Sequence, residues 1–476
     1  MDESLNDLLK TVPKVDKILE DVRVRLLLER FPRDLVLDCI RDHLKGLRDR
    51  LVRPPKTIAG APDQGHSRIP HFPEIVDGLV SLTETRLGRG LVDAVNGTGI
   101  VLHTGLGRAP FPKQAQAALA DAVRGYCTLQ VDRETGKRGD RHAHVEGLLK
   151  RITGAEAALV VNNNAAATLL VLNTLAEGKD VVVSRGELVE IGGSFRIPDV
   201  LKRSGARMVE VGTTNRTHLK DYEQAVGPET SLLLKVHQSN YRIVGFAKQV
   251  PIGDLAELAR TKGIRVVDDL GSGALVDLSR WGLPKEPMVQ ESVQAGADAV
   301  CFSGDKLVGG PQCGIVVGKK AAIDVMKKNP LMRALRVDKM TYAVLEATLR
   351  LFLDEGKLLR NHPVLSMLCE PADSVRKRCL GLKRKLKAVA KGHAVLDVVK
   401  EYSEAGSGSL AADPLPTYAL SIRIEGMPAE ELSRRFRLSS PPVFGRIKGG
   451  RFLLDCRTVQ RNDSGAVEKA FVKILM

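Results

Sequence analysis

Between about residues 155 and 320, short apolar runs alternate with helix-like segments. Helical patterns such as 165–176, 219–226 and 254–262 separate seven runs that we expect as strands, at 158–161, 180–184, 207–211, 232–237, 265–269, 299–303 and 314–318. Continuous apolar strands joined through helices predict an α/β fold with a mostly parallel sheet covered on both faces. Ligands of such folds bind beyond the carboxyl ends of the strands, so residues at those ends are the first candidates for a site.

The regions that flank this alternation have a different character. Residues 1–57 carry apolar residues at helical spacing and predict a small helical N-terminal module. Prolines and glycines predict a linker over 58–94, interrupted by a helix-like segment at 75–86. We therefore expect a large domain over 95–345 and a small C-terminal α/β domain over 346–476.

Composition narrows the class of protein. The chain has 72 Lys and Arg against 57 Asp and Glu, a net charge of +15. This surplus favours an anionic partner but leaves nucleic acid, a phosphorylated substrate and plain solubility open. The seven cysteines are widely spaced without a Cys-x-x-Cys pair, which is typical of reduced thiols in a cytoplasmic protein. Neither a signal peptide nor an apolar run of about 18 residues is visible, so we expect no membrane association.

A lysine follows the strand expected at 299–303. Lys306 comes three residues after Ser303 and precedes the paired glycines Gly309 and Gly310. A partly desolvated amine at a strand end can form a Schiff base with an aldehyde cofactor, and pyridoxal phosphate (PLP) is the obvious one. A surface lysine in a glycine-rich turn explains this stretch alone equally well.

Two further strand ends carry polar residues. Asn162, Asn163 and Asn164 open an alanine-rich helix, whose free amides and dipole suit a phosphate, although Asn164 as a simple helix cap is the alternative. Asp269 ends the strand at 265–269, where a carboxylate can bond a pyridinium nitrogen and keep PLP an electron sink. We prefer it to Asp268 because a small residue follows two positions later. The combination of a phosphate loop, an aspartate and a lysine, each at a strand end and in this order, is less probable by chance than any one of the three alone.

That order is the order of fold-type I PLP enzymes, and the local sequences resemble bacterial selenocysteine synthases, the L-seryl-tRNA(Sec) selenium transferases. The resemblance covers essentially the whole chain and is carried by segments 95–100, 104–108, 161–167, 210–217, 236–241, 269–273, 303–306 and 329–336. One departure is Cys313, which stands where a smaller alanine is expected.

The resemblance implies a reaction and an assembly. Lys306 holds PLP, the seryl group of seryl-tRNA(Sec) displaces it, and the alpha proton is removed. Loss of water from the beta carbon gives an aminoacrylyl intermediate, to which selenium from selenophosphate adds to form selenocysteinyl-tRNA(Sec). The family further implies a cytoplasmic homodecamer and a tRNA-binding role for the N-terminal module.

Individual roles follow from the same resemblance. Lys306 and Asp269 are the expected catalytic residues, with the freed Lys306 amine as general base. The expected cofactor-binding residues are Asn163, Asn164, Ala165, Asp269, Ser303 and Lys306. Arg108, Arg333 and Arg336 resemble the arginines that bind the anionic selenium donor, and the last two share one helix face if their segment is helical. No metal site is expected.

Two other functions compete with this interpretation. One is a PLP-dependent lyase of a small phosphorylated or amino-acid substrate, against which the N-terminal module argues. The other is a nucleic-acid-binding regulator with a PLP fold as sensor, against which the nearly balanced charge of residues 1–57 argues. The basic stretch 376–391 fits either a tRNA contact or a solvated helix face.

Overall fold

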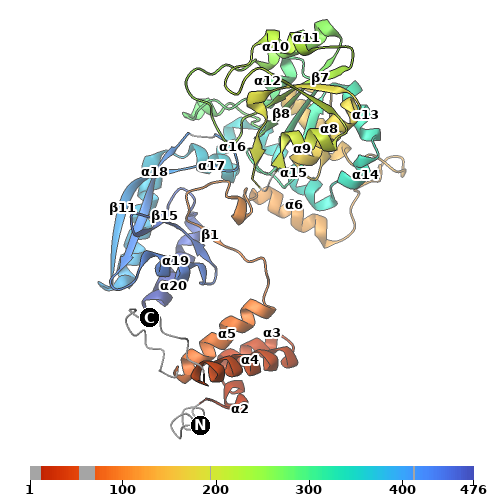
Figure 1. Ribbon diagram of the computed structural model, residues 1–476. Helices are drawn as coiled ribbons and strands as arrows, with labels where there is room; N and C mark the ends of the chain where they lie inside the picture. Colours follow the sequence, from red (N-terminus) through yellow and green to blue (C-terminus); the bar gives the residue numbers. More distant parts are fainter. Residues whose placement is uncertain (1–11, 53–69, 193–194, 411–412) are drawn as a thin grey trace. The chain divides into compact units, whose positions relative to one another are not determined.

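The computed structural model describes residues 12–52, 70–192, 195–410 and 413–476. The chain divides into two compact units, Met1–Asp93 and Ala94–Met476. Figure 1 labels their helices and strands. Part of the predicted linker, residues 53–69, lies outside the described residues.

The first unit is helical, as predicted. It contains α2 (Val15–Leu19), α3 (Val22–Arg30), α4 (Arg33–Val52) and α5 (Phe72–Leu87). Asp21 caps α3, because its side chain accepts a hydrogen bond from the Arg23 backbone amide at 2.9 Å. The apolar faces of these helices form one core, which includes Ile18, Leu27, Ile40 and Leu79.

Helix α5 lies within the stretch 58–94 that we predicted as a linker. Its residues Ile75, Val76 and Leu79 are buried in the same core as α3 and α4. Ion pairs of Arg30 with Glu84 and of Arg86 with Asp42 tie it to those helices. The helical unit therefore extends beyond residue 57, because the apolar face of α5 is buried within it.

The second unit contains a seven-stranded sheet in the order β2-β10-β9-β8-β7-β3-β6. All seven predicted strands are confirmed, as β2 (Ala157–Val161), β3 (Asp180–Ser184), β6 (Arg207–Val211), β7 (Thr230–Val236), β8 (Arg265–Gly271), β9 (Ala299–Ser303) and β10 (Gly314–Gly318). The five strands from β9 to β6 are parallel, and β10 runs antiparallel to both its neighbours. The sheet is thus mostly parallel, as expected.

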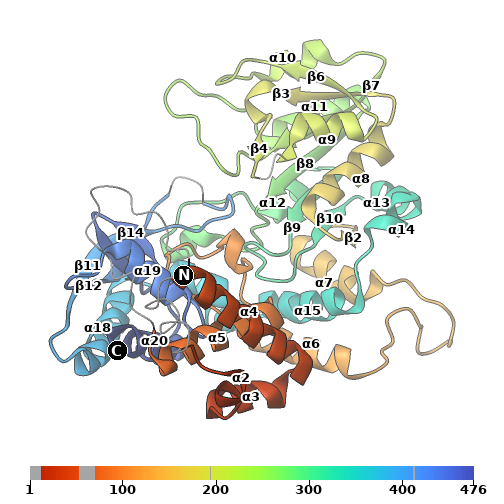
Figure 2. The same ribbon diagram turned by 60° about the horizontal axis from the view of Figure 1, so that its bottom comes forward.

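Helices cover both faces of this sheet. Buried residues of α8 (Asn164–Ala176), α9 (Ile197–Arg203) and α13 (Lys320–Lys328) form the core on one face, where Figures 1 and 2 show α8 and α9. The other face packs against α7 (Ala143–Thr153), α11 (Ile252–Lys262), α12 (Val289–Gln294) and α15 (Lys339–Arg350). Apolar side chains on alternate positions of each strand face one core or the other, which explains the continuous apolar runs.

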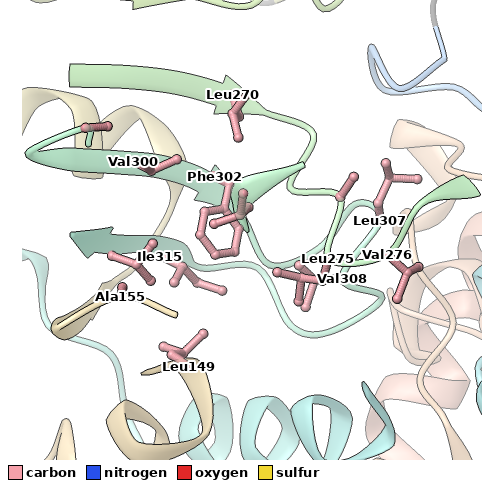
Figure 3. Packing of buried hydrophobic residues seen from close by; sticks show 14 of the residues in the cluster. Leu149, Ala155, Leu270, Leu275, Val276, Val300, Phe302, Leu307, Val308 and Ile315 are labelled. Carbon is pink, nitrogen blue, oxygen red and sulfur yellow. The ribbon is translucent and has the colours of Figure 1, made fainter. Parts of the chain in front are cut away.

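The segment that carries Lys306 is anchored from both sides. Phe302 on β9 is fully buried before it, and Leu307 and Val308 are buried directly after it. Figure 3 shows these three side chains within the core together with Leu275 and Ile315. The lysine therefore lies on a backbone fixed by packing rather than on a free loop.

The C-terminal part forms a four-stranded antiparallel sheet, β11 (Ala394–Ser403), β12 (Leu415–Ile424), β15 (Arg451–Asp455) and β14 (Arg446–Lys448). Its core includes buried residues of α18 (Ala372–Ala390), α19 (Ala429–Arg437) and α20 (Ser464–Leu475).

The two domain limits within this unit differ from those expected. Buried Leu358 and Leu365, from α16 (Glu355–Asn361) and α17 (Pro363–Cys369), belong to the large-domain core, so the small domain begins after residue 346. Strand β1 (Val95–Asn96) pairs with β13 (Val443–Phe444), and Val95 is buried in the small-domain core. Contacts between distant segments set these limits.

Candidate active site

Lys306 is buried directly beyond the carboxyl end of β9, with 6% of its surface exposed. Burial lowers its pKa, and the nearby Arg108 guanidinium lowers it further, while Asp269, Asp305 and Glu286 oppose the shift. Lys306 is therefore not a surface lysine in a glycine-rich turn, because its amine lies in a desolvated cluster of charged groups. A lowered pKa favours the neutral, nucleophilic form of the amine.

Arg108 reaches this cluster from a tight turn. Its Nη1 lies 2.6 Å from Oδ2 of Asp305, the residue before Lys306. Gly107 and Arg108 both have positive φ, 86° and 60°, so the turn that presents the guanidinium is left-handed. Arg108 thus places a permanent positive charge beside the lysine.

Asp269 joins the lysine cluster from β8. Its Oδ1 accepts a hydrogen bond from Asn164 Nδ2 at 2.8 Å, and its Oδ2 accepts one from Thr168 Oγ1 at 2.9 Å. Burial raises the pKa of Asp269, whereas these two donors and Lys306 lower it. The carboxyl group is held between α8 and the lysine.

Asp268 has a different environment. It accepts a hydrogen bond from Ser292 Oγ of α12 at 2.6 Å, and adjacent strand residues point to opposite faces of a sheet. Burial raises its pKa to about 7. Of the two aspartates left open by the sequence, Asp269 is the one whose pKa Lys306 affects directly.

The raised pKa of Asp268 predicts a pH effect on stability. Between about pH 4 and pH 7 the unfolded chain ionises this carboxyl while the folded chain retains its proton, so the free energy of unfolding falls as the pH rises, by up to about 4 kcal/mol. Asp268→Asn removes the titration. Thermal melts should therefore show Tm of the variant rising relative to the unaltered protein between pH 4 and pH 8. A Tm difference independent of pH would contradict the prediction.

The predicted phosphate residues lie at the start of α8 and the end of β9. Asn163 caps α8, since its Oδ1 accepts from the Ala166 amide at 2.8 Å. Asn164 is therefore not the cap, and its Oδ1 is buried without a hydrogen-bond partner among the described residues. Ala165 follows in the first helical turn, and Ser303 is buried at the end of β9.

Arg333 and Arg336 lie elsewhere along the sheet edge. Helix α14 (Leu331–Leu335) ends before Arg336, which is extended and bridges to Val161 at the end of β2. The expectation that the two arginines share a helix face is therefore wrong, because the chain leaves the helix to pair with β2. Arg141, Arg333 and Arg138 together lower the pKa of Arg336, which shows that four cations gather here.

Two residues of the lysine cluster have no role assigned from the sequence. His237 follows β7, and burial and nearby lysines lower its pKa to about 4, so the ring is neutral. Burial raises the pKa of Glu286, which Lys306 lowers in part. The position of His237 at a strand end could have identified it, whereas Glu286 lies in a loop that carries no comparable signal.

Within the described ranges, no group of three or more His, Cys, Asp and Glu side chains is arranged to hold a metal ion. No helix there has the length and apolar character needed to cross a membrane. All seven cysteines are free thiols. Cys313, the departure noted in the sequence, is buried, and burial raises its pKa.

Comparison of the backbone with solved structures confirms the fold-type I architecture. The chain resembles D-glucosaminate-6-phosphate ammonia-lyase, with a TM-score of 0.55 and 20% identity, over 82% of this chain and 97% of that one. The mostly parallel sheet and the small C-terminal sheet are the elements expected of PLP enzymes of this class.

Sequence comparison identifies the family. The L-seryl-tRNA selenium transferase model matches residues 94–460, and the model of the selenocysteine synthase N terminus matches residues 9–48. The L-seryl-tRNA(Sec) selenium transferase of Geobacter sulfurreducens is 48% identical, over 96% of this chain and 97% of that protein. The enzyme of the same name from Alkaliphilus oremlandii is 44% identical, over 98% of each chain. This chain therefore belongs to the L-seryl-tRNA selenium transferase family.

Proposed function

We propose that this protein converts seryl-tRNA(Sec) to selenocysteinyl-tRNA(Sec) with PLP as cofactor and selenophosphate as selenium donor. The observation that carries the proposal is the buried cluster of Lys306, Asp269 and Asn164 in a chain that matches the family over both of its parts. The alternative, a lyase of a small substrate, does not explain the match of residues 9–48 to the N-terminal family model.

The residues around Lys306 fit PLP. The lowered pKa of Lys306 favours the neutral amine that reacts with an aldehyde, and Asp269 supplies a buried carboxyl group for the ring nitrogen. Buried polar atoms of Asn164 and His237 have no hydrogen-bond partner among the described residues, as expected of groups that meet a ligand. We assign the phosphate to Asn163, Asn164, Ala165 and Ser303, at the first turn of α8 and the end of β9.

PLP, when bound, supplies an electron sink that makes the alpha proton of an attached amino acid acidic. Lys306 Nζ is the group placed to take that proton, because it is a buried amine with a lowered pKa. Burial raises the pKa of Asp269, and the hydrogen bonds from Asn164 and Thr168 oppose that rise and so favour the charged carboxylate. Loss of the seryl hydroxyl as water would then leave the dehydrated aminoacyl group to accept selenium.

The arginines supply positive charge that suits the binding of the anionic selenium donor. Arg108 lies beside Lys306, and Arg333 and Arg336 gather with Arg138 and Arg141 at the end of β2. Mutual repulsion lowers the pKa of Arg336, and an anion among these guanidinium groups would relieve that repulsion. We therefore assign selenophosphate binding to Arg108, Arg333 and Arg336.

Replacing Arg333 should impair donor use selectively. Arg333→Ala should raise KM for selenophosphate about tenfold to a hundredfold, since a hydrogen bond to a charged group is lost, with PLP absorbance unchanged. The matched control is Arg265→Ala, because Arg265 is exposed at the amino end of β8, away from the carboxyl ends of the strands. Equal KM values for the two variants would remove Arg333 from the donor site.

The N-terminal unit would bind the tRNA, and the decameric assembly and cytoplasmic location expected from the resemblance remain part of the proposal. The test compares seryl-tRNA(Sec) with free serine, using the full chain and a chain that begins at Ala94, the first residue of the second unit. The full chain should process the charged tRNA far more efficiently. The shortened chain should keep PLP but bind tRNA weakly. Free serine used as efficiently as the tRNA would favour the small-molecule lyase.

A further inference from the structure

A cavity of about 530 Å³ lies between the small domain and the loop after β7. Its described lining comes from two segments distant in sequence, Ser239–Asn240 and residues 404–410 with 413 and 414. None of the residues assigned above to cofactor or donor lines it. We propose that it binds the terminal ribose of the aminoacyl-tRNA through Glu404, Ser239 and Ser409, an inference that rests on the proposed function.

The loop that forms one wall is held in place by the large domain. The Glu404 amide donates to the Gly99 carbonyl at 2.9 Å, and the Leu102 amide donates to the Ala405 carbonyl at 2.8 Å. The Ser407 hydroxyl donates to the Leu102 carbonyl at 2.6 Å. The wall is therefore preformed.

The opposite wall approaches this loop closely. Gly408 has a φ of 72°, and a Cβ at this position would lie 2.8 Å from the Ser239 carbonyl oxygen. A side chain at position 408 would therefore push the two walls apart. The Arg242–Asp413 ion pair, at 3.1 Å, provides a second link between the same two segments.

Two hydroxyl groups of the lining have no hydrogen-bond partner among the described residues. Ser239 and Ser409 are each 2% exposed, and the Oγ atoms of both are buried and unpaired. Buried hydroxyls are nearly always hydrogen-bonded, so two of them at one cavity indicate a ligand that supplies the missing partners.

The cavity adjoins the lysine cluster. Glu286 lies between the two: burial raises its pKa, and the Leu410 amide and the charge of Lys306 both oppose that rise. The Ser239 amide donates to the carbonyl of His237, whose own amide donates to the Asp269 carbonyl. The seryl group must reach Lys306, and the ester joins it directly to the terminal ribose. A ligand bound in this cavity would therefore lie near Lys306, as the terminal ribose must.

The chemistry of the lining favours a neutral, hydroxylated ligand. Among the described residues that line the cavity there is no lysine or arginine, so a phosphate is a poor match. Glu404 and Asp413 are the carboxylates, and Arg242 pairs with Asp413. Carboxylates recognise ribose hydroxyls as hydrogen-bond donors, and the 2′-hydroxyl is both donor and acceptor. Glu404 is thus suited to accept from the 2′-hydroxyl, with the two serines as further partners.

The test uses seryl-tRNA that ends in adenosine or in 2′-deoxyadenosine, with the holoenzyme. The unaltered protein should prefer the ribose end in kcat/KM by about tenfold to a hundredfold, the effect of one hydrogen bond to a charged group. Glu404→Ala should lose most of that preference while its PLP absorbance stays unchanged, and Ser409→Ala should reduce it. Glu425→Ala, at an exposed glutamate in the turn after β12, should keep it in full.

The outcomes separate this inference from the proposed function. If the unaltered protein converts both tRNAs equally, or if Glu404→Ala keeps the full preference, the ribose assignment is overturned and the function stands. If the unaltered protein converts neither tRNA, the proposed function fails and the ribose assignment fails with it.

Discussion

Lys306→Ala should abolish the visible-edge absorbance of lysine-bound PLP and lower turnover by about 10²- to 10⁴-fold or more, the range contributed by a general acid–base group. The reason is that the variant loses two functions of one buried amine. In the proposed reaction the Lys306 nitrogen would attach the cofactor and, once freed, would take the alpha proton. Absorbance spectra and single-turnover rates with seryl-tRNA measure the two functions separately.

A matched control for this variant is Lys320→Ala. Lys320 is exposed at the start of α13 and pairs with Asp324 at 2.7 Å, so its loss should change neither the spectrum nor the rate. Retention of the PLP band in Lys306→Ala would show that another lysine carries the cofactor and would refute the assignment.

Asp269→Asn should lower kcat by about 10²- to 10³-fold, the effect of removing one preorganised electrostatic group from an active site. The amide can still contact Asn164 and Thr168, but it carries no negative charge to balance the ring nitrogen of PLP. PLP should remain bound, because Lys306 and the start of α8 are unaltered. Pre-steady-state removal of the alpha proton measures the expected loss.

The neighbouring aspartate provides the control for this substitution. Asp268→Asn replaces an equally buried carboxyl group that is hydrogen-bonded to Ser292 on α12. Turnover at neutral pH should therefore change little in that variant. If Asp268→Asn were the more damaging change, the two aspartates would have been assigned in the wrong order.

Much of the large domain could be predicted because its strands are buried on both faces and read as continuous apolar runs. Side chains at the ends of parallel strands meet at one edge, so Asn164 and Asp269 could be placed together, and the structure joins them at 2.8 Å. The burial of Lys306 follows from the apolar residues on both sides of it.

Other features depend on contacts that no local pattern records. Helix α5 belongs to the N-terminal unit because its apolar face meets α3 and α4, although the prolines before it are typical of a linker. Arg336 leaves the helix of Arg333 because it pairs with Val161, a residue far away in sequence. Glu286 enters the lysine cluster through tertiary packing alone.

The basic stretch 376–391 lies on α18, which has a buried apolar face and charged residues outside that face. Val375, Cys379, Leu382 and Leu386 form the buried face of α18. Arg378 is committed to the fold, since it pairs with Glu370 at 2.7 Å and donates to the Cys456 carbonyl. A tRNA contact by the remaining charges of this helix stays a prediction.

We expect this chain to convert a tRNA-borne serine to selenocysteine. The most direct measurement incubates the purified protein with PLP, seryl-tRNA(Sec) and selenophosphate, then releases the aminoacyl group and determines its mass. We expect selenocysteine, formed only when all three components are present and lost in Lys306→Ala. Recovery of unchanged serine from the complete reaction, with PLP bound to the protein, would contradict it.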